Sequence, residues 1–295
     1  GFSIYLPNYS GVLAAICIYL GCFQPLNING SGLIRMKNKI ALVFDFDGTV
    51  SPSVMLSLIF DATGINEHEF WSYAGTLADL GYDRELSYLK ALCDFCTPQG
   101  IKLTNNKLRE IGSQLQFYPG FPEIIDRLKL VSHSLGFTLE VYVITAGLQE
   151  MVEGSRLGPY LTRCWGCLYG EDGEGSISFP MQVVTSANKV EKLYLIKRQL
   201  LEHKNEYQVN LVEPRGDLIP WANLVYLADG ATDVPAFEVV RRGGGLTIAI
   251  YDPDVGNIER NMIAGRTHLL AAADYREGSY LDLVLNAAIK NAERL

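Results

Sequence analysis

The feature that most constrains the fold of this 295-residue sequence is a set of four short apolar runs, each followed by polar residues. The runs are rich in β-branched and aromatic residues, which is typical of strands buried on both faces of a parallel sheet. With 48% hydrophobic and 20% charged residues, the chain has enough apolar side chains to bury such a sheet. The predicted strands are residues 40–46, 139–145, 224–228 and 246–251.

Helical patterns separate these runs, with apolar residues spaced three and four apart. Because strands and helices alternate, the sequence predicts an α/β fold with a doubly wound parallel sheet. The predicted helices are residues 121–135, 149–157, 190–202 and 234–241.

One stretch, residues 53–117, interrupts the alternation with amphipathic helical segments and no convincing strand. We interpret it as a helical insertion after the first strand, closed by Tyr118-Pro119-Gly120. The predicted division is therefore a core of residues 37–52 and 118–295 with an inserted helical domain of residues 53–117. Its helical segments are residues 53–62, 67–79, 84–95 and 105–115.

The N-terminal extension, residues 1–36, has a different character. Residues 1–34 carry no charge, and residues 11–23 form an apolar run too short to span a bilayer but long enough for the apolar part of a signal peptide. No Lys or Arg precedes it, and Met36-Lys37-Asn38-Lys39 resembles a cytosolic start. Three interpretations stay open: an extension without function, an export or anchoring segment, and a packed arm. We do not expect membrane association unless residues 1–35 are a genuine anchor.

The net charge and the cysteine content indicate which classes of partner and which cellular compartment to expect. The net charge is −8, with 25 Lys and Arg against 33 Asp and Glu, so the basic surface of a nucleic-acid-binding protein is not expected. Six cysteines in a chain of this length do not indicate a disulfide framework. A cytoplasmic location is therefore predicted, with export or anchoring as the alternative. The oligomeric state is not readable from the sequence.

Polar residues at the ends of the predicted strands indicate where chemistry takes place, because ligands of open α/β sheets bind there. The first strand is followed by Asp45-Phe46-Asp47-Gly48-Thr49, and the second ends at Thr145. Asp229 and Asp233 follow the third strand, and Lys189 precedes a helix. These positions predict a group of carboxylates with one hydroxyl and one ammonium.

Such a group suits phosphoryl transfer. Clustered carboxylates without thiolate or imidazole favour Mg²⁺, and one carboxylate can attack phosphorus while another acts as acid and base. Lys189, the Thr145 hydroxyl and loop N–H groups can bind the phosphoryl oxygens. The candidate phosphate-binding loop residues are Phe46, Gly48, Thr49, Ala146 and Gly147.

These four motifs, in this order, resemble those of the haloacid dehalogenase-like hydrolase superfamily. Phe117-Tyr118-Pro119-Gly120 and Gly147-Leu148-Gln149-Glu150 are similar to its phosphoserine phosphatase-like branch. The resemblance runs from about residue 37 to the C-terminus. It implies a Rossmann-like core with a helical C1-type cap.

The resemblance also implies roles for the motif residues. Asp45 would be the nucleophile and Asp47 the general acid and base. The metal ligands would be Asp45, the main-chain carbonyl of Asp47, and Asp229. Asp233, counted with the metal site, would orient a metal-bound water or Lys189, although Lys192 one turn later could replace Lys189.

Departures from the pattern bear on the substrate. Ala228 stands where the fourth motif usually opens with Gly or Ser, and Val54 stands where phosphoserine phosphatases place an acid. Val54 therefore argues against phosphoserine itself as the substrate. The candidate substrate contacts in the cap are Tyr73, Asp79, Tyr82, Asp83 and Arg84.

Two Cys-x-x-Cys pairs, Cys93 with Cys96 and Cys164 with Cys167, have the spacing of a zinc site. The first pair falls in a predicted helix and the second enters a predicted core strand. Buried free thiols are the favoured interpretation, with a metal that bridges cap and core, or a redox role, as alternatives.

The sequence as a whole predicts a Mg²⁺-dependent phosphatase that hydrolyses a small phosphorylated metabolite through an aspartyl-phosphate. A phosphomutase with the same catalytic residues is one alternative, and a non-catalytic phosphate-binding module is the other.

Overall fold

The computed structural model describes residues 38–202, 218–253 and 264–294. The described residues all belong to one compact unit of the chain, which begins at residue 37. The predicted N-terminal extension lies outside the described residues, so the expectations for it stay predictions. Within the described ranges, none of the helices combines the length and the apolarity needed to span a bilayer.

A seven-stranded sheet forms the centre of the compact unit, in the order β4-β3-β2-β1-β5-β6-β7. All neighbouring strands are parallel except β3 and β4. The central strand β1 pairs with β2 on one side and β5 on the other, so the winding direction reverses at β1. The strands are β1 Lys39–Phe44, β2 Thr138–Leu148, β3 Arg163–Glu171, β4 Ile177–Gln182, β5 Leu224–Ala228, β6 Leu246–Tyr251 and β7 Leu269–Ala272.

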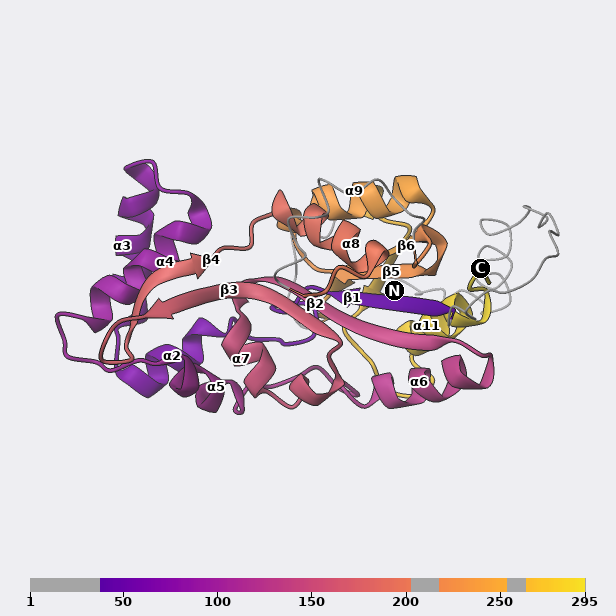
Figure 1. Cartoon of the computed structure of the whole chain (residues 1–295), viewed down its shortest axis with the longest axis horizontal. Coiled ribbons are helices and arrows are strands. Elements are labelled where there is room, and N and C mark those ends of the chain that lie inside the picture. The colour runs from indigo at the N-terminus through magenta and orange to yellow at the C-terminus, as the bar shows by residue number, and fades with distance from the viewer. Residues whose placement is uncertain (1–37, 203–217, 254–263, 295) are drawn as a thin grey trace, which may run out of the picture. The chain divides into compact units, whose positions relative to one another are not determined.

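Helices cover both faces of this sheet, which confirms the predicted α/β doubly wound fold (Figure 1). Helices α8 and α9 lie on one face, and α6, α7 and α11 lie on the other. The central strands are buried because they are mostly apolar; in β1, Ile40–Phe44 are at most 2% exposed, and all of β5 is buried. These helices are α6 Ile124–Ser134, α7 Gln149–Gly154, α8 Asn188–Arg198, α9 Val234–Gly243 and α11 Tyr280–Lys290.

Four helices between β1 and β2 occupy the segment predicted as a helical insertion. Side-chain oxygens of Asn66 and Thr104 cap α3 and α5 by accepting from backbone N–H groups in the first turn. The helices are α2 Leu56–Thr63, α3 Glu67–Asp79, α4 Arg84–Cys96 and α5 Asn105–Gly112. We call residues 53–117 the cap; their boundaries as a domain stay a prediction.

Strands β3 and β4 form an arm that the sequence analysis recognised only in part. The first half of β3 pairs with β2, and its second half continues outward to pair with antiparallel β4. The arm contacts the cap: Tyr169 donates its hydroxyl to the Leu89 carbonyl at 2.8 Å, and the Ile177 amide donates to the Leu103 carbonyl at 2.8 Å. The cap is therefore attached to an extension of the sheet as well as to its own chain connections.

A second attachment joins α5 of the cap to α7 of the core through two glycines. A Cβ atom on Gly112 would lie 2.1 Å from the backbone oxygen of Met151, and one on Gly154 would lie 2.2 Å from that of Arg109. Side chains at these positions would push the two backbones apart. The backbones of α5 and α7 are therefore in direct contact.

We expect Gly112→Ala to lower the free energy of unfolding by about 1–3 kcal/mol, because the added methyl group overlaps backbone that cannot rotate away. Gly75→Ala is the matched control. Gly75 lies inside α3 with nothing within 4 Å of its Cβ position, so alanine there should raise the stability by about 0.5–1 kcal/mol. Urea denaturation of both variants checks the signs; equal effects would contradict the close packing.

Candidate active site

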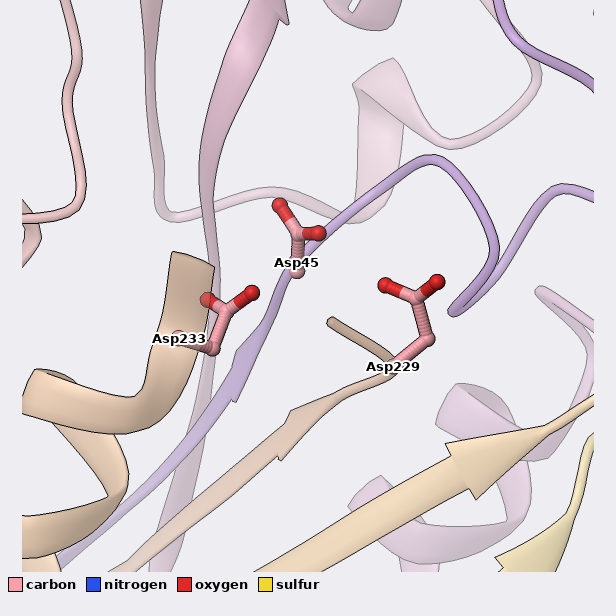
Figure 2. Close-up of side chains that lie close together, drawn as sticks. All are labelled: Asp45, Asp229 and Asp233. Atoms are coloured by element: carbon pink, nitrogen blue, oxygen red, sulfur yellow. The ribbon is translucent and has the colours of Figure 1, made fainter. Parts of the chain in front are cut away.

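Three aspartates from two distant parts of the chain meet at the carboxyl ends of β1 and β5. Asp45 follows β1, Asp229 follows β5, and Asp233 lies at the start of α9. Each offers a carboxylate oxygen, and these oxygens lie within 4.8 Å of one another. Figure 2 shows Asp45 between Asp233 and Asp229. They meet because β1 and β5 are parallel neighbours, whose ends lie at the same edge of the sheet.

Lys189 supplies the positive charge of this cluster from the first turn of α8. Its Nζ donates to Asp45 Oδ1 at 3.0 Å and to Asp233 Oδ1 at 2.6 Å, and the residue is only 1% exposed. Burial alone would lower the pKa of Lys189, but the carboxylates of Asp233 and Asp45 outweigh it and raise that pKa above its usual value. Lys192, the alternative left open by the sequence, donates to Glu191.

Asp233 is held by three donors. Its Oδ1 accepts from Lys189 and, at 2.5 Å, from the hydroxyl of Tyr226, and its Oδ2 accepts from Thr232 at 3.1 Å. Tyr226 lies within β5, where the sequence analysis counted it only as an apolar strand residue. These contacts favour a role for Asp233 in orienting Lys189 rather than a role as a direct metal ligand.

A tight turn directly after β1 places Asp47 near Asp45. The carbonyl of Phe46 accepts from the amides of Thr49 and Val50, and the amide of Gly48 donates to the Ser51 carbonyl at 2.8 Å. Asp47 Oδ1 accepts from the Met55 amide at 3.3 Å. The amides of Gly48 and Thr49 thus donate within the turn, and their predicted role as phosphate donors stays a prediction.

Two structural features require glycine at position 48, which Gly48 occupies. Its φ of +74° lies in the left-handed region, and a Cβ atom there would lie 2.2 Å from Asp229 Oδ2. The turn after β1 therefore packs directly against the metal-ligand candidate of β5.

The end of β2 contributes Thr145, Ala146 and Gly147. The Thr145 side chain is buried, and its Oγ1 accepts from the Gly147 amide at 3.0 Å. The carbonyl of Ala146 accepts from the hydroxyl of Tyr88 in α4 and from the thiol of Cys167 in β3. Tyr88 is a cap residue next to this loop that the sequence analysis did not single out.

Three carboxyl groups of the site, those of Asp45, Asp47 and Asp229, have raised pKa values. Burial, partly offset by Lys189, raises the pKa of Asp45 to about 6. Burial and then the charge of Asp45 raise the pKa values of Asp47 and Asp229 to about 8. One ammonium therefore does not compensate this group of buried carboxylates.

The donor set suits a hard divalent cation. In the part of the chain that the structure describes, the one group of acidic, His or Cys side chains with converging ligand atoms contains only aspartates. Carboxylate oxygens are the ligands Mg²⁺ prefers, and a cation there would relieve the mutual repulsion. Asp45 and Asp229 are placed to hold it.

Comparison with solved structures identifies the architecture. A HAD family hydrolase from Salmonella enterica serovar Typhi superposes with a TM-score of 0.54 at 16% identity, over 84% of this chain and 70% of the other. A probable phosphoserine phosphatase from Vibrio cholerae gives 0.54 at 15% identity, over 87% and 67%. A phospho-aspartyl intermediate analogue of phosphoserine phosphatase gives 0.50 at 17% identity, over 84% and 98%. The chain has the haloacid dehalogenase-like fold.

Sequence comparison adds one relative of this chain. An uncharacterized protein of Borreliella burgdorferi strain B31 is 26% identical over 273 residues, which cover 83% of this chain and 94% of the relative. No family model matches the sequence.

The four cysteines of the two Cys-x-x-Cys pairs are free and buried in this haloacid dehalogenase-like structure. Burial raises the pKa of Cys93 and of Cys96 to about 11, and it raises the pKa values of Cys164 and Cys167 as well. Raised thiol pKa values favour the protonated form, which is a poor metal ligand.

The cap residues proposed as substrate contacts lie in α3, at the start of α4 and at the turn between them. Tyr73 donates its hydroxyl to Asp94 at 2.7 Å, within the cap. The remaining candidates are exposed at and around the turn between α3 and α4; they are Asp79, Tyr82, Asp83 and Arg84.

One carboxylate near the site was missed by the sequence analysis. Asp252 directly follows β6 and accepts from the hydroxyl of Tyr118 at 3.0 Å. Burial, then Asp252 and Asp229, raise the pKa of Tyr118. The rule used for the other strand ends would have found Asp252.

We expect Gly48→Ala to weaken Mg²⁺ binding at least tenfold in isothermal titration calorimetry, because the new methyl group displaces Asp229 and strains the turn. Gly230→Ala is the matched control. Gly230 also lies beside Asp229, but its φ is −112° and the atom nearest to its Cβ position is 3.5 Å away. The affinity of this variant for Mg²⁺ should therefore stay within about twofold of the wild type. Equal affinities for Mg²⁺ in the two variants would contradict the assigned site.

Proposed function

We propose that this chain belongs to the haloacid dehalogenase-like superfamily and hydrolyses a small phosphomonoester with Mg²⁺ through an aspartyl-phosphate on Asp45. The main support for the proposal is the position of Lys189, which bonds to both Asp45 and Asp233. Asp229 lies beside them, and the group stands at the end of β1, where the winding of the sheet reverses. The phosphatase neighbours in the structural comparison support it.

Asp45 is suited to the nucleophilic step. It lies at the end of a rigid central strand, and its Oδ1 bond to buried Lys189 fixes the rotation of the carboxylate. In the first step Asp45 attacks phosphorus, the bond between phosphorus and the ester oxygen breaks, and the alcohol leaves. Lys189 and bound Mg²⁺ supply the positive charge that the phosphoryl oxygens need.

Asp47 is suited to proton transfer. Two residues after Asp45 and bonded to the Met55 amide, it is held at the same strand end but carries no bond to Lys189 in the structure. In the first step Asp47 donates a proton to the leaving oxygen. In the second it removes a proton from the water that hydrolyses the acyl phosphate, releasing inorganic phosphate and regenerating Asp45.

The substrate is proposed to be a small phosphorylated metabolite. Val54, at the position where the resemblance expects an ammonium-binding acid, is 53% exposed beside Met55, whose amide holds Asp47. An apolar residue there does not attract a charged amine, so phosphoserine is not the favoured substrate. Release of inorganic phosphate across sugar, nucleotide, amino-acid and amino-alcohol phosphates tests the substrate class.

Removal of divalent cations should abolish activity. EDTA treatment should reduce hydrolysis of p-nitrophenyl phosphate to background, because the buried carboxylates then repel both one another and the phosphate. Added Mg²⁺ should restore the rate, and Zn²⁺ should not. Full activity after exhaustive chelation would contradict the assignment.

Two variants should separate the roles of Asp45 and Asp47. Asp47→Asn keeps the nucleophile but loses the acid and base, which are worth about 100- to 10,000-fold, so the covalent intermediate should accumulate. With p-nitrophenyl phosphate, whose leaving group needs little protonation, mass spectrometry should find a phosphoryl adduct of about 80 Da on the peptide containing Asp45. Asp45→Asn should give no adduct. An adduct on another peptide would show that the nucleophile is a different residue.

A further inference from the structure

The carbonyl of Ala146 has two donors that reach it from different parts of the fold. Tyr88 of α4 donates its hydroxyl at 2.5 Å, and Cys167 of β3 donates its thiol at 3.2 Å. Tyr88 is 8% exposed, so water does not compete freely for this bond. Ala146 immediately follows Thr145, the hydroxyl residue of the proposed site.

Fixing this carbonyl also fixes the Gly147 amide, because both belong to one planar trans peptide group and point in opposite directions. The Gly147 N–H donates to Thr145 Oγ1 at 3.0 Å. A hydroxyl oxygen that accepts this bond directs its own hydrogen elsewhere. The peptide group thus determines how the Thr145 hydroxyl is oriented.

We propose that Tyr88 is a positioning residue of the cap, which holds the Ala146–Gly147 peptide so that the Thr145 hydroxyl donates to the phosphoryl group. This inference rests on the proposed function. It gives the cap a part in phosphate binding that is separate from contact with the rest of the substrate. Tyr88 itself acts only through Ala146, Gly147 and Thr145.

A neighbouring tyrosine offers a matched control, because its hydroxyl also attaches the cap to another part of the fold. Tyr169 is 1% exposed and donates its hydroxyl to the backbone carbonyl of Leu89, the residue after Tyr88. Both hydroxyls bridge α4 to another part of the fold and both bond to a carbonyl. Only the bond of Tyr88 ends on the Thr145 loop.

The test measures binding of inorganic phosphate to the full chain in saturating Mg²⁺ by isothermal titration calorimetry. Tyr88→Phe should weaken binding about three- to tenfold, the range expected for one lost hydrogen bond. Tyr169→Phe should bind phosphate as the wild type does. Unchanged binding in Tyr88→Phe, or equal weakening in Tyr169→Phe, would overturn the proposal.

A double-mutant cycle tests the route through Thr145. In a Thr145→Val background, Tyr88→Phe should have no further effect on phosphate binding, because the hydroxyl it orients is gone. A full Tyr88→Phe effect in that background would overturn the proposal.

The second donor provides variants that do not depend on folding of Tyr88→Phe. Cys167→Ala should weaken phosphate binding, by less than Tyr88→Phe because a thiol is a weak donor, and Cys167→Ser should retain wild-type affinity. Equal binding by both Cys167 variants would count against the proposal.

Turnover of p-nitrophenyl phosphate separates this inference from the proposed function. A wild type that binds phosphate without hydrolysing the ester would overturn the phosphatase assignment, and the binding data would still decide on Tyr88. A wild type that hydrolyses the ester, with normal phosphate binding in Tyr88→Phe, would overturn only the role of Tyr88.

Discussion

The ion pairs of Lys189 with Asp45 and Asp233 are the constraint on which the site depends. An ammonium that is 1% exposed has lost its hydration, and only well-placed carboxylates offset that cost. Breaking such buried pairs typically costs about 3–5 kcal/mol, because a charge is left without a partner. The ends of β1 and β5 and the first turns of α8 and α9 are therefore held in one arrangement.

This arrangement also accounts for the electrostatics of the site. Lys189 offsets part of the charge of Asp45 and Asp233, whereas Asp229 and Asp47 are further carboxylates with pKa values raised by burial and by Asp45. The resulting excess of negative charge is what a divalent cation would neutralise. Gly48 lets the turn after β1 approach Asp229 closely enough to keep this group compact.

The cap of this chain is tied to the core by more than its two chain connections. The arm binds α4 through Tyr169, α5 crosses α7 at Gly112, and Tyr88 bonds to the Ala146 carbonyl. Each contact involves backbone atoms, which cannot rotate away as side chains do. Two of these three contacts, those of Tyr169 and Tyr88, are made by α4.

The sequence by itself determined the α/β class, four of the strands and the identity of the motif residues, because apolar periodicity and strand-end polarity are local signals. Strands β5 and β6 begin and end where predicted. Other strands were not predicted because their local signals are weak: β4 contains Pro180 and exposed Phe179 and Met181, and β7 has only four residues. The predicted cytoplasmic location and the N-terminal expectations stay predictions.

Only the tertiary structure shows the bonds of Lys189 to Asp45 and Asp233, which favour it over Lys192, since both lysines lie at helical positions. It alone revealed Tyr226 behind Asp233 and Tyr88 on the Ala146 carbonyl. The physical reason is that these partners lie on separate elements, from 7 positions apart for Tyr226 and Asp233 to 144 for Lys189 and Asp45. A side chain's own periodicity says which face it occupies, but the packing of the other elements decides which groups it meets there.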